Sequence, residues 1–331
     1  MVNWNGDIAK LSLPTPFAVG DVNVYVLKGE ALTLIDTGVK TVQSREALVY
    51  GLEELGLKLS DIEQIILTHH HPDHAGALDF FDKEVPVYGH QNNQRWLTLS
   101  DEFLDIHNAF FLDFAGKLGV EEELKHKLIH DREEIKFLSK RKLQGYLAEG
   151  DELPGLPGWR VIETAGHAQS HVSFYRERDG VMIAGDHLLA KISPNPLMEP
   201  PLLMDGVRQR PLLQYNAALQ KLLDFTISKV YSGHGGEIDG DKVADLIRYR
   251  LERQHNRAMQ VKSMLQEKPL TGFEVCQQLF PKVYRQEVDL TLSETVGQLD
   301  YLEDLGEIVT EMNSGVVLYS SATTVSKGII Y

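Results

Sequence analysis

Cysteine is almost absent from this 331-residue chain, because Cys276 is the only one. A single thiol cannot form an intrachain disulfide, and it cannot supply the thiolates of a cysteine-based metal site. Basic residues are also few: 33 Lys and Arg stand against 48 Asp and Glu, which gives a formal charge of −15. This balance opposes broad binding to the phosphates of nucleic acids, so a nucleic-acid partner is not expected.

The sequence has no long apolar segment either. No run approaches the ~18 apolar residues that a membrane helix needs. The first residues, Met1 to Asp7, have neither the basic part nor the apolar part of a secretory signal. With 43% hydrophobic and 24% charged residues, the composition is typical of a globular protein. We therefore expect a soluble, cytoplasmic protein without membrane contact.

Five short apolar runs rich in β-branched residues are present, and each precedes a polar or glycine-containing turn. They cover residues 32–35, 65–68, 160–163, 181–184 and 229–231. Such runs predict buried strands. Helical patterns lie between them, for example at 44–55 and 212–223, so the fold class is predicted to be α/β. Each run leads within a few residues to an aspartate or a histidine: Asp36, the cluster at 69–74, His167, Asp186 and His234.

The cluster His69-His70-His71-Pro72-Asp73-His74 is the strongest chemical signal. In an extended segment, residues i and i+2 point the same way, so His69 and His71 can share one metal ion. Pro72 then turns the chain, and the next two residues can offer an oxygen and a nitrogen to a second ion. Nitrogen and carboxylate ligands without thiolate suit Zn²⁺, and also Fe²⁺ or Mn²⁺.

Two metal ions need more ligands than one loop supplies, and the other strand ends provide His167, Asp186 and His234. A carboxylate can bridge two cations, and this is the role predicted for Asp186. Three further histidines lie beside these ligands. His70 and His171 could donate a proton or hydrogen-bond a loop, and we favour the loop role. His187 could contact the substrate.

These motifs resemble those of metallo-β-lactamase-fold hydrolases. The matching segments, in chain order over about residues 10–238, are Ile-Asp-Thr-Gly with Asp36, the cluster at 69–74, His167, Ala-Gly-Asp-His with Asp186, and Ser-Gly-His-Gly with His234. The resemblance implies an αββα four-layer sandwich with the site at one edge. It implies two divalent metal ions, with these ligands: His69, His71 and His167 for one, Asp73, His74 and His234 for the other, and Asp186 between them. Asp36 would hold the ligand loops from behind.

The metals suggest hydrolysis of a small-molecule substrate. A hydroxide between two cations forms near neutral pH, and Asp73 is the predicted catalytic residue that orients it. We expect a small ester, thioester or lactone as the substrate, because the predicted helical insert at about 92–147 carries an aromatic helix face. Two alternatives stay open. One is a metal-dependent nuclease acting on RNA or DNA, and the other is a mononuclear iron dioxygenase acting on a persulfide.

Residues 241–331 have a different character from the domain predicted at 1–240. A long charged helix is expected at 241–267. Capping-box patterns at Thr271/Glu274 and Thr291/Glu294 predict two more helices, and a hairpin should follow around Asn313-Ser314-Gly315. This is the order of a winged helix, and the tail resembles the winged-helix extension of some metallo-β-lactamase-fold proteins. Residues 286–315 contain no Lys or Arg and eight acids, which argues against DNA binding and favours packing or homodimerisation.

Overall fold

The computed structural model describes residues 2–129, 136–202 and 206–322. By their contacts the residues form two compact units, residues 1–106 with 130–250, and residues 107–129 with 251–331. The division falls at Arg250, inside helix α8 (Gly240–Met264). It also places residues 107–129 of the predicted insert in the second unit. Parts of the predicted segments 92–147 and 241–331 lie outside the described residues.

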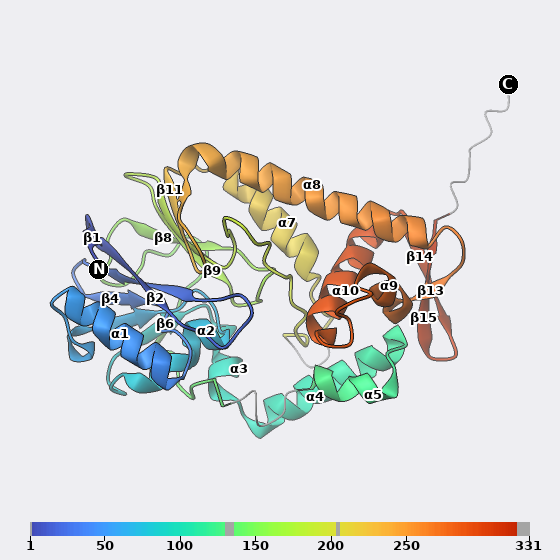
Figure 1. Ribbon diagram of the computed structural model, residues 1–331, viewed down its shortest axis with the longest axis horizontal. Helices are drawn as coiled ribbons and strands as arrows, with labels where there is room; N and C mark the ends of the chain where they lie inside the picture. The colour runs from blue at the N-terminus through green and yellow to red at the C-terminus, as the bar shows by residue number, and fades with distance from the viewer. Residues whose placement is uncertain (1, 130–135, 203–205, 323–331) are drawn as a thin grey trace. The chain divides into compact units, whose positions relative to one another are not determined.

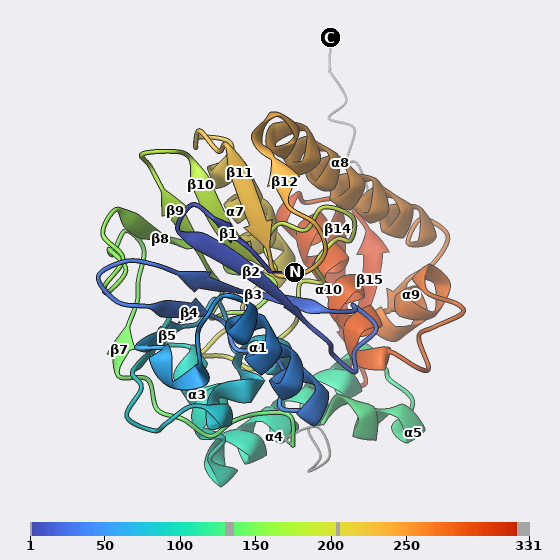
Figure 2. The same ribbon diagram turned by 60° about the vertical axis from the view of Figure 1, so that its left-hand side comes forward.

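The first unit is built on two mixed β-sheets (Figure 2). The seven-stranded sheet runs in chain order: β1 (Trp4–Asn5), β2 (Ile8–Leu13), β3 (Val22–Leu27), β4 (Thr33–Ile35), β5 (Gln64–Ile66), β6 (Val87–Gly89) and β7 (Gly145–Tyr146). The five-stranded sheet has the order β12 (Ile238–Asp239), β11 (Lys229–Ser232), β10 (Val181–Gly185), β9 (Val172–Arg176) and β8 (Trp159–Glu163). All five predicted strands are present, as β4, β5, β8, β10 and β11, so the α/β prediction is confirmed.

An apolar core joins the two sheets. It contains buried side chains from strands of both: Ile8, Tyr25, Leu27, Ile35 and Ile66 from the first sheet, and Trp159, Val161, Val172, Phe174, Ile183 and Tyr231 from the second. Strand side chains alternate between faces, so Met182 and Val230 point to the opposite side of the second sheet from Ile183 and Tyr231. Both are also fully buried. The second sheet is therefore covered on its two faces.

Helices cover the outer faces. Helix α1 (Val42–Glu54) packs Leu48 and Leu52 against β2 and β3. A Cβ on Gly51 would lie 2.6 Å from a methyl carbon of Leu11, so a larger residue there would force the Leu11 side chain to shift. Helix α7 (Pro211–Leu222) lies on the side of the second sheet (Figure 1). The first unit thus has the layer order helix, sheet, sheet, helix.

Parallel pairing in both sheets positions the predicted site. β4, β5 and β6 are parallel, so their carboxyl ends meet at one edge of the first sheet. β10 and β11 are parallel in the second sheet. Loops that leave β5, β10 and β11 carry six of the predicted ligands, as expected for parallel strands in α/β proteins, and His167 follows β8. The helices α2 (Pro72–Ala75) and α3 (Asn93–Thr98) follow β5 and β6.

The second unit contains the end of α4 (Asp101–Leu118), α5 (Glu122–Lys125), α9 (Gly272–Leu279) and α10 (Val288–Asp304), with a three-stranded sheet in the order β13-β15-β14. The capping box of Thr271 and Glu274 is present. The second predicted capping box is wrong. Helix α10 begins at Val288, and the Thr291 hydroxyl donates to the Glu287 carbonyl oxygen inside the helix. Burial of Val288 and Leu292 on one helix face explains the earlier start.

The predicted hairpin is also present, as β14 (Ile308–Asn313) and β15 (Val316–Ser321). Its turn residues, Ser314 and Gly315, both have positive φ, as a type I′ turn requires. Among the described residues, no helix is long and apolar enough to cross a membrane.

Candidate metal centre

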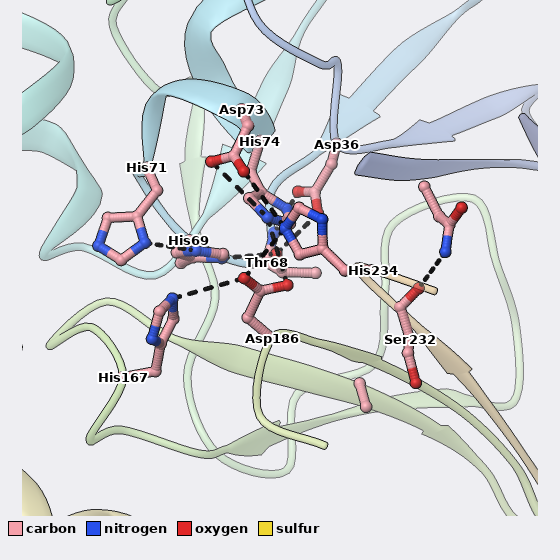
Figure 3. A network of polar contacts seen from close by, with 12 residues as sticks. Asp36, Thr68, His69, His71, Asp73, His74, His167, Asp186, Ser232 and His234 are labelled. Atoms are coloured by element: carbon pink, nitrogen blue, oxygen red, sulfur yellow. Dashed lines mark hydrogen bonds and ion pairs between the residues drawn. The ribbon is translucent and has the colours of Figure 1, made fainter. Parts of the chain in front are cut away.

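Four loops bring the seven predicted ligands to one place (Figure 3). The cluster at 69–74 follows β5 and begins helix α2, and His167 lies in the loop between β8 and β9. Asp186 comes directly after β10, and His234 comes two residues after β11. All seven side chains belong to the first unit. The predicted convergence of the strand ends is therefore what the structure shows.

His69, His71 and His167 form the first ligand group. One ligand atom from each lies within 4.8 Å of the others. The His69 Nε2 and His71 Nδ1 atoms are 2.9 Å apart. Three imidazole nitrogens converging in this way are a typical ligand set for a divalent metal ion.

Asp73, His74 and His234 form the second ligand group, and their ligand atoms also lie within 4.8 Å of one another. The Asp73 Oδ2 atom is 3.2 Å from His234 Nε2, and the Asp73 Oδ1 atom is 4.0 Å from His74 Nε2. The group therefore offers two nitrogens and a carboxylate.

Asp186 lies between the two groups (Figure 3). Its Oδ2 atom is 3.5 Å from His167 Nε2 in the first group and 3.4 Å from His234 Nε2 in the second. Its Oδ1 atom is 3.4 Å from His74 Nε2. The carboxylate is thus within reach of both groups, which is the geometry that a bridging ligand needs.

Four ligand atoms at this centre are buried and form no hydrogen bond of normal geometry, although carboxylate oxygens of Asp73 and Asp186 lie 3.2 to 3.5 Å from the three nitrogens among them. The ligand atoms concerned are His74 Nε2, His167 Nε2, His234 Nε2 and Asp186 Oδ1. A buried polar atom without a partner costs about 1–3 kcal/mol. Divalent cations would satisfy all four at once, so the residues fit bound metal and are positioned to bind it.

Asp36 supports the cluster at 69–74 from behind. Its Oδ1 atom accepts from the Thr68 backbone N–H at 2.8 Å, and its Oδ2 atom accepts from the Thr68 hydroxyl at 2.7 Å. The same Oδ2 atom lies 2.8 Å from His74 Nδ1. With Nδ1 donating to this carboxylate, His74 presents Nε2 as an acceptor to a cation. Asp36 adopts φ of 59°, an uncommon value for a residue other than glycine, and this strain is concentrated at the site.

Strand β3 of the first sheet holds the loop that carries His234. The Asp21 carbonyl oxygen lies 2.8 Å from His234 Nδ1, which again leaves Nε2 for a cation. The Asn23 amide donates to the carbonyl oxygens of Ser232 and Gly235 at 3.0 and 2.9 Å. Sequence reasoning did not include β3, although the run Val-Asn-Val-Tyr-Val-Leu carries the signal of a strand.

His167 is held by the loop that follows Asp186, where the Asn195 carbonyl oxygen lies 2.8 Å from its Nδ1 atom. His70 and His171 also form hydrogen bonds with loop residues. His70 Nδ1 is 2.8 Å from the Ser170 hydroxyl, and His171 Nε2 accepts from the Asp186 backbone N–H at 3.0 Å.

His187 is fully buried against Tyr215, and neither of its ring nitrogens has a hydrogen-bond partner among the described residues. Burial lowers the pKa of its imidazole to about 3. The ring is therefore neutral at physiological pH.

The histidines of the first ligand group are neutral near pH 7. Burial lowers the pKa of His69 and of His71 well below 6.5, and the neighbouring histidines lower it further. Burial also lowers the pKa of His167, against the opposing attraction of Asp186. These nitrogens can accept a cation without losing a proton first.

The second ligand group has the opposite electrostatics. Although burial opposes its charge, the carboxylates of Asp186, Asp73 and Asp36 raise the pKa of His74 well above 6.5. Burial likewise opposes charge on His234, yet Asp186 and Asp73 raise its pKa to about 9. In the metal-free protein these imidazoles therefore carry protons where cations would bind.

One glycine makes this packing achievable. A Cβ on Gly233 would lie 2.1 Å from Asp186 Oδ1 and 2.9 Å from a ring carbon of His74. No side chain fits there, so the Ser-Gly-His segment must contain glycine for Asp186 to stand between the two groups.

A family model described as "Metallo-beta-lactamase superfamily" matches residues 18–234. The chain belongs to this superfamily. Members are metal-dependent hydrolases, and the prediction of an enzyme of this class is confirmed. The α/β metallo-β-lactamase fold is confirmed as well.

Similar proteins extend the match over nearly the whole chain. A probable metallo-hydrolase, YqjP of Bacillus subtilis (strain 168), is 45% identical over 315 residues, which cover 95% of this chain and 97% of that protein. The crystal structure of a metallo-beta-lactamase family protein from Thermus thermophilus has a TM-score of 0.78 and 30% identity, covering 96% of this chain and 99% of that one. A beta-lactamase domain protein from Burkholderia ambifaria shares the fold, with a TM-score of 0.75, 23% identity and coverage of 97% and 95%.

Proposed function

We propose that the chain is a dinuclear metal-dependent hydrolase that acts on a small ester, thioester or lactone. The observation that carries the proposal is the position of Asp186 between two ligand groups, with buried and unsatisfied ligand atoms in both. One ion would take His69, His71 and His167, and the other would take Asp73, His74 and His234. Zn²⁺ suits these nitrogen and oxygen donors.

Two divalent ions bound there would supply a nucleophile at neutral pH by lowering the pKa of a bound water, and would polarise the scissile carbonyl group. The chain's own residues have the following tasks. Asp73 has a carboxylate oxygen 3.2 Å from His234 Nε2, and we assign it to orient the attacking water. Asp36 and the Asp21 carbonyl oxygen fix His74 and His234 with their Nε2 atoms facing inward.

Local charge supports an uncharged ester over a phosphodiester. Among the residues that the structure describes, three carboxylates contact the ligand histidines, those of Asp36, Asp73 and Asp186. No lysine or arginine of the described chain forms an ion pair with a ligand, and the whole chain carries a formal charge of −15. A polyanionic substrate would find little compensation beyond the metal ions themselves.

The test combines metal analysis with a substrate panel. Protein purified without oxygen should contain two divalent ions per chain, and should hydrolyse at least one class among esters, thioesters and lactones. A single iron with oxygen consumption on a persulfide would replace this proposal by a dioxygenase. Cleavage of RNA or phosphodiesters with salt-sensitive binding would replace it by a nuclease.

We also propose that the second unit is winged-helix-like and forms a homodimer contact. Its elements follow the order α9, α10 and the hairpin β14–β15, with β13 paired to β15. Edge strand β14 leaves Val309 and Met312 more than half exposed. Light scattering that gives twice the chain mass would support this proposal, and a monomeric mass would refute it.

A further inference from the structure

Glu199 is a buried carboxylate in the proline-rich loop after β10. Its side chain is 5% exposed, and it belongs to no metal-binding motif. Burying a carboxylate is costly unless charge and hydrogen bonds compensate it. Here both kinds of compensation are present, and they link two parts of the first unit that are far apart in sequence.

Three donors meet at this carboxylate. Arg95 Nη2 donates to Oε2 at 2.6 Å, and Trp96 Nε1 donates to the same oxygen at 3.0 Å. The Gln169 backbone N–H donates to Oε1 at 2.7 Å. Arg95 and Trp96 lie on helix α3, whereas Gln169 is two residues after the ligand His167. Glu199 therefore connects helix α3 to the His167 loop.

A second set of contacts, through His70, also connects helix α3 to the His167 loop, so the contacts form a closed circuit. The Trp96 ring stacks on His70, with centroids 4.4 Å apart and planes inclined by only 4°. His70 Nδ1 is 2.8 Å from the Ser170 hydroxyl, next to Gln169. His70 lies between the ligands His69 and His71. This closed circuit of contacts therefore joins the segments that carry all three members of the first ligand group.

The same loop fixes the tautomer of His167. Four residues before Glu199, the Asn195 carbonyl oxygen lies 2.8 Å from His167 Nδ1. The second ligand group has other supports, namely Asp36 and the Asp21 carbonyl oxygen. The three hydrogen bonds of the Glu199 carboxylate go to none of these supports.

We infer that Glu199 is a positioning residue that sets the metal affinity of the first ligand group and not that of the second. The inference rests on the proposed function, because it requires that both groups bind cations. Substitution of residues behind the ligands typically lowers metal affinity by about 10–100-fold. Glu199→Gln keeps the side-chain shape but removes the charge and one acceptor, so Arg95 and the Gln169 N–H can no longer both be satisfied.

The experiment measures Zn²⁺ affinity of the full chain by competition with a chelator, in two backgrounds. His234→Ala leaves the first ligand group intact, and His167→Ala leaves the second intact. Glu199→Gln should lower Zn²⁺ affinity by about 10–100-fold in the His234→Ala background. It should leave the affinity unchanged in the His167→Ala background. An equal loss in both backgrounds, or no loss in either, would overturn the inference.

Two further variants guard against a general loss of stability. Trp96→Phe keeps an aromatic ring for His70 but removes the N–H, and should produce a smaller loss in the same background only. If Glu199→Gln does not fold, Trp96→Phe is the test: a loss of Zn²⁺ affinity in the His234→Ala background only supports the inference, and any other result overturns it. Asp7→Asn is the matched control, because Asp7 pairs with the buried Arg176 away from the ligands. It should lower the melting temperature without changing Zn²⁺ affinity in either background.

The outcomes separate the inference from the proposed function. If the unaltered chain takes up no divalent metal, the proposed function fails, and the inference fails with it. If the unaltered chain binds two ions and Glu199→Gln binds them equally well, only the inference fails.

Discussion

The two ligand groups share one carboxylate but differ in charge and in support. The first group consists of neutral histidines, and the loop at 195–199 holds it through the Asn195 carbonyl oxygen and Glu199. The second group pairs carboxylates with protonated histidines, and Asp36 and strand β3 hold it. The comparison shows that two groups of similar ligand atoms can differ in protonation: burial keeps the first group free of protons, whereas in the second group a cation must displace the protons that the carboxylates attract.

Substitution of Asp186 should affect the two ligand groups alike. Asp186→Ala removes the shared oxygen, so both groups should lose affinity and turnover should fall. Metal catalysis contributes several kcal/mol, so we expect a loss of about 1000-fold or more. Metal content and steady-state kinetics are the measurements, with His69→Ala as a comparison that first empties one group. Full activity in either variant would remove the basis of the assignment.

Asp36 should affect the second ligand group more than the first. Asp36→Asn keeps the size of the side chain but replaces one of its two acceptor oxygens by an NH₂ group. If that oxygen is Oδ2, both His74 Nδ1 and the Thr68 hydroxyl lose their acceptor. Zn²⁺ affinity of the second group should fall by about 10–100-fold. The measurement is chelator competition in the His167→Ala background. Equal weakening in the His234→Ala background would show that Asp36 acts on both groups alike.

The pH dependence of metal binding should also separate the groups. His234 has a pKa of about 9, so below pH 9 a cation must displace its proton. Affinity of the second group should therefore rise with pH from 7 to 9, by up to about tenfold per unit for each displaced proton. The first group has pKa values lowered below 6.5, so its affinity should be flat over this range. Calorimetric titration in buffers of different ionisation enthalpy counts the protons released. Identical proton release from both groups would contradict this prediction.

Asn23 should give the smallest effect. Asn23→Ala removes two hydrogen bonds to the loop of His234, at a cost of about 1–3 kcal/mol in the free energy of unfolding. The backbone bond from Asn23 to Gly233 remains, so metal affinity of the second group should fall only slightly. Gln64→Ala is the matched control: Gln64 is also a buried amide that donates to a carbonyl oxygen, but it lies at the start of β5. Thermal unfolding with and without Zn²⁺ measures both. If Gln64→Ala lowered metal affinity as much as Asn23→Ala, the effect of Asn23→Ala would have to be attributed to a general loss of stability.

Much of the framework could be predicted from local sequence. The runs before Asp36, His69 and Asp186 are short, apolar and β-branched, and they form strands as predicted. Thr271 and Glu274 form a capping box because that motif depends only on residues three positions apart. Thr291 and Glu294 show the limit of such a pattern, since burial of Val288 extends helix α10 past it.

Apart from Asp36, which the family resemblance implied, the supports behind the ligands could not be predicted in this way. Glu199 lies in an irregular loop without periodicity, and its donors come from helix α3 and the His167 loop. Asn23 is a polar residue inside a strand. Its amide finds hydrogen-bond acceptors, the carbonyl oxygens of Ser232 and Gly235, only because the two sheets pack together. These roles depend on contacts between residues about 30 to 210 positions apart, which no short pattern records.

The sequence by itself determined which side chains are available as ligands and which strand each one follows, because strand formation and residue chemistry are local properties. The family resemblance implied the ligand sets, but only the tertiary structure brings His167 to His69 and His71, places Asp186 within reach of both groups, and gives the two groups opposite protonation. The physical reason is that distance, burial and charge at the site are set by how two sheets pack together, and packing is a property of the whole fold.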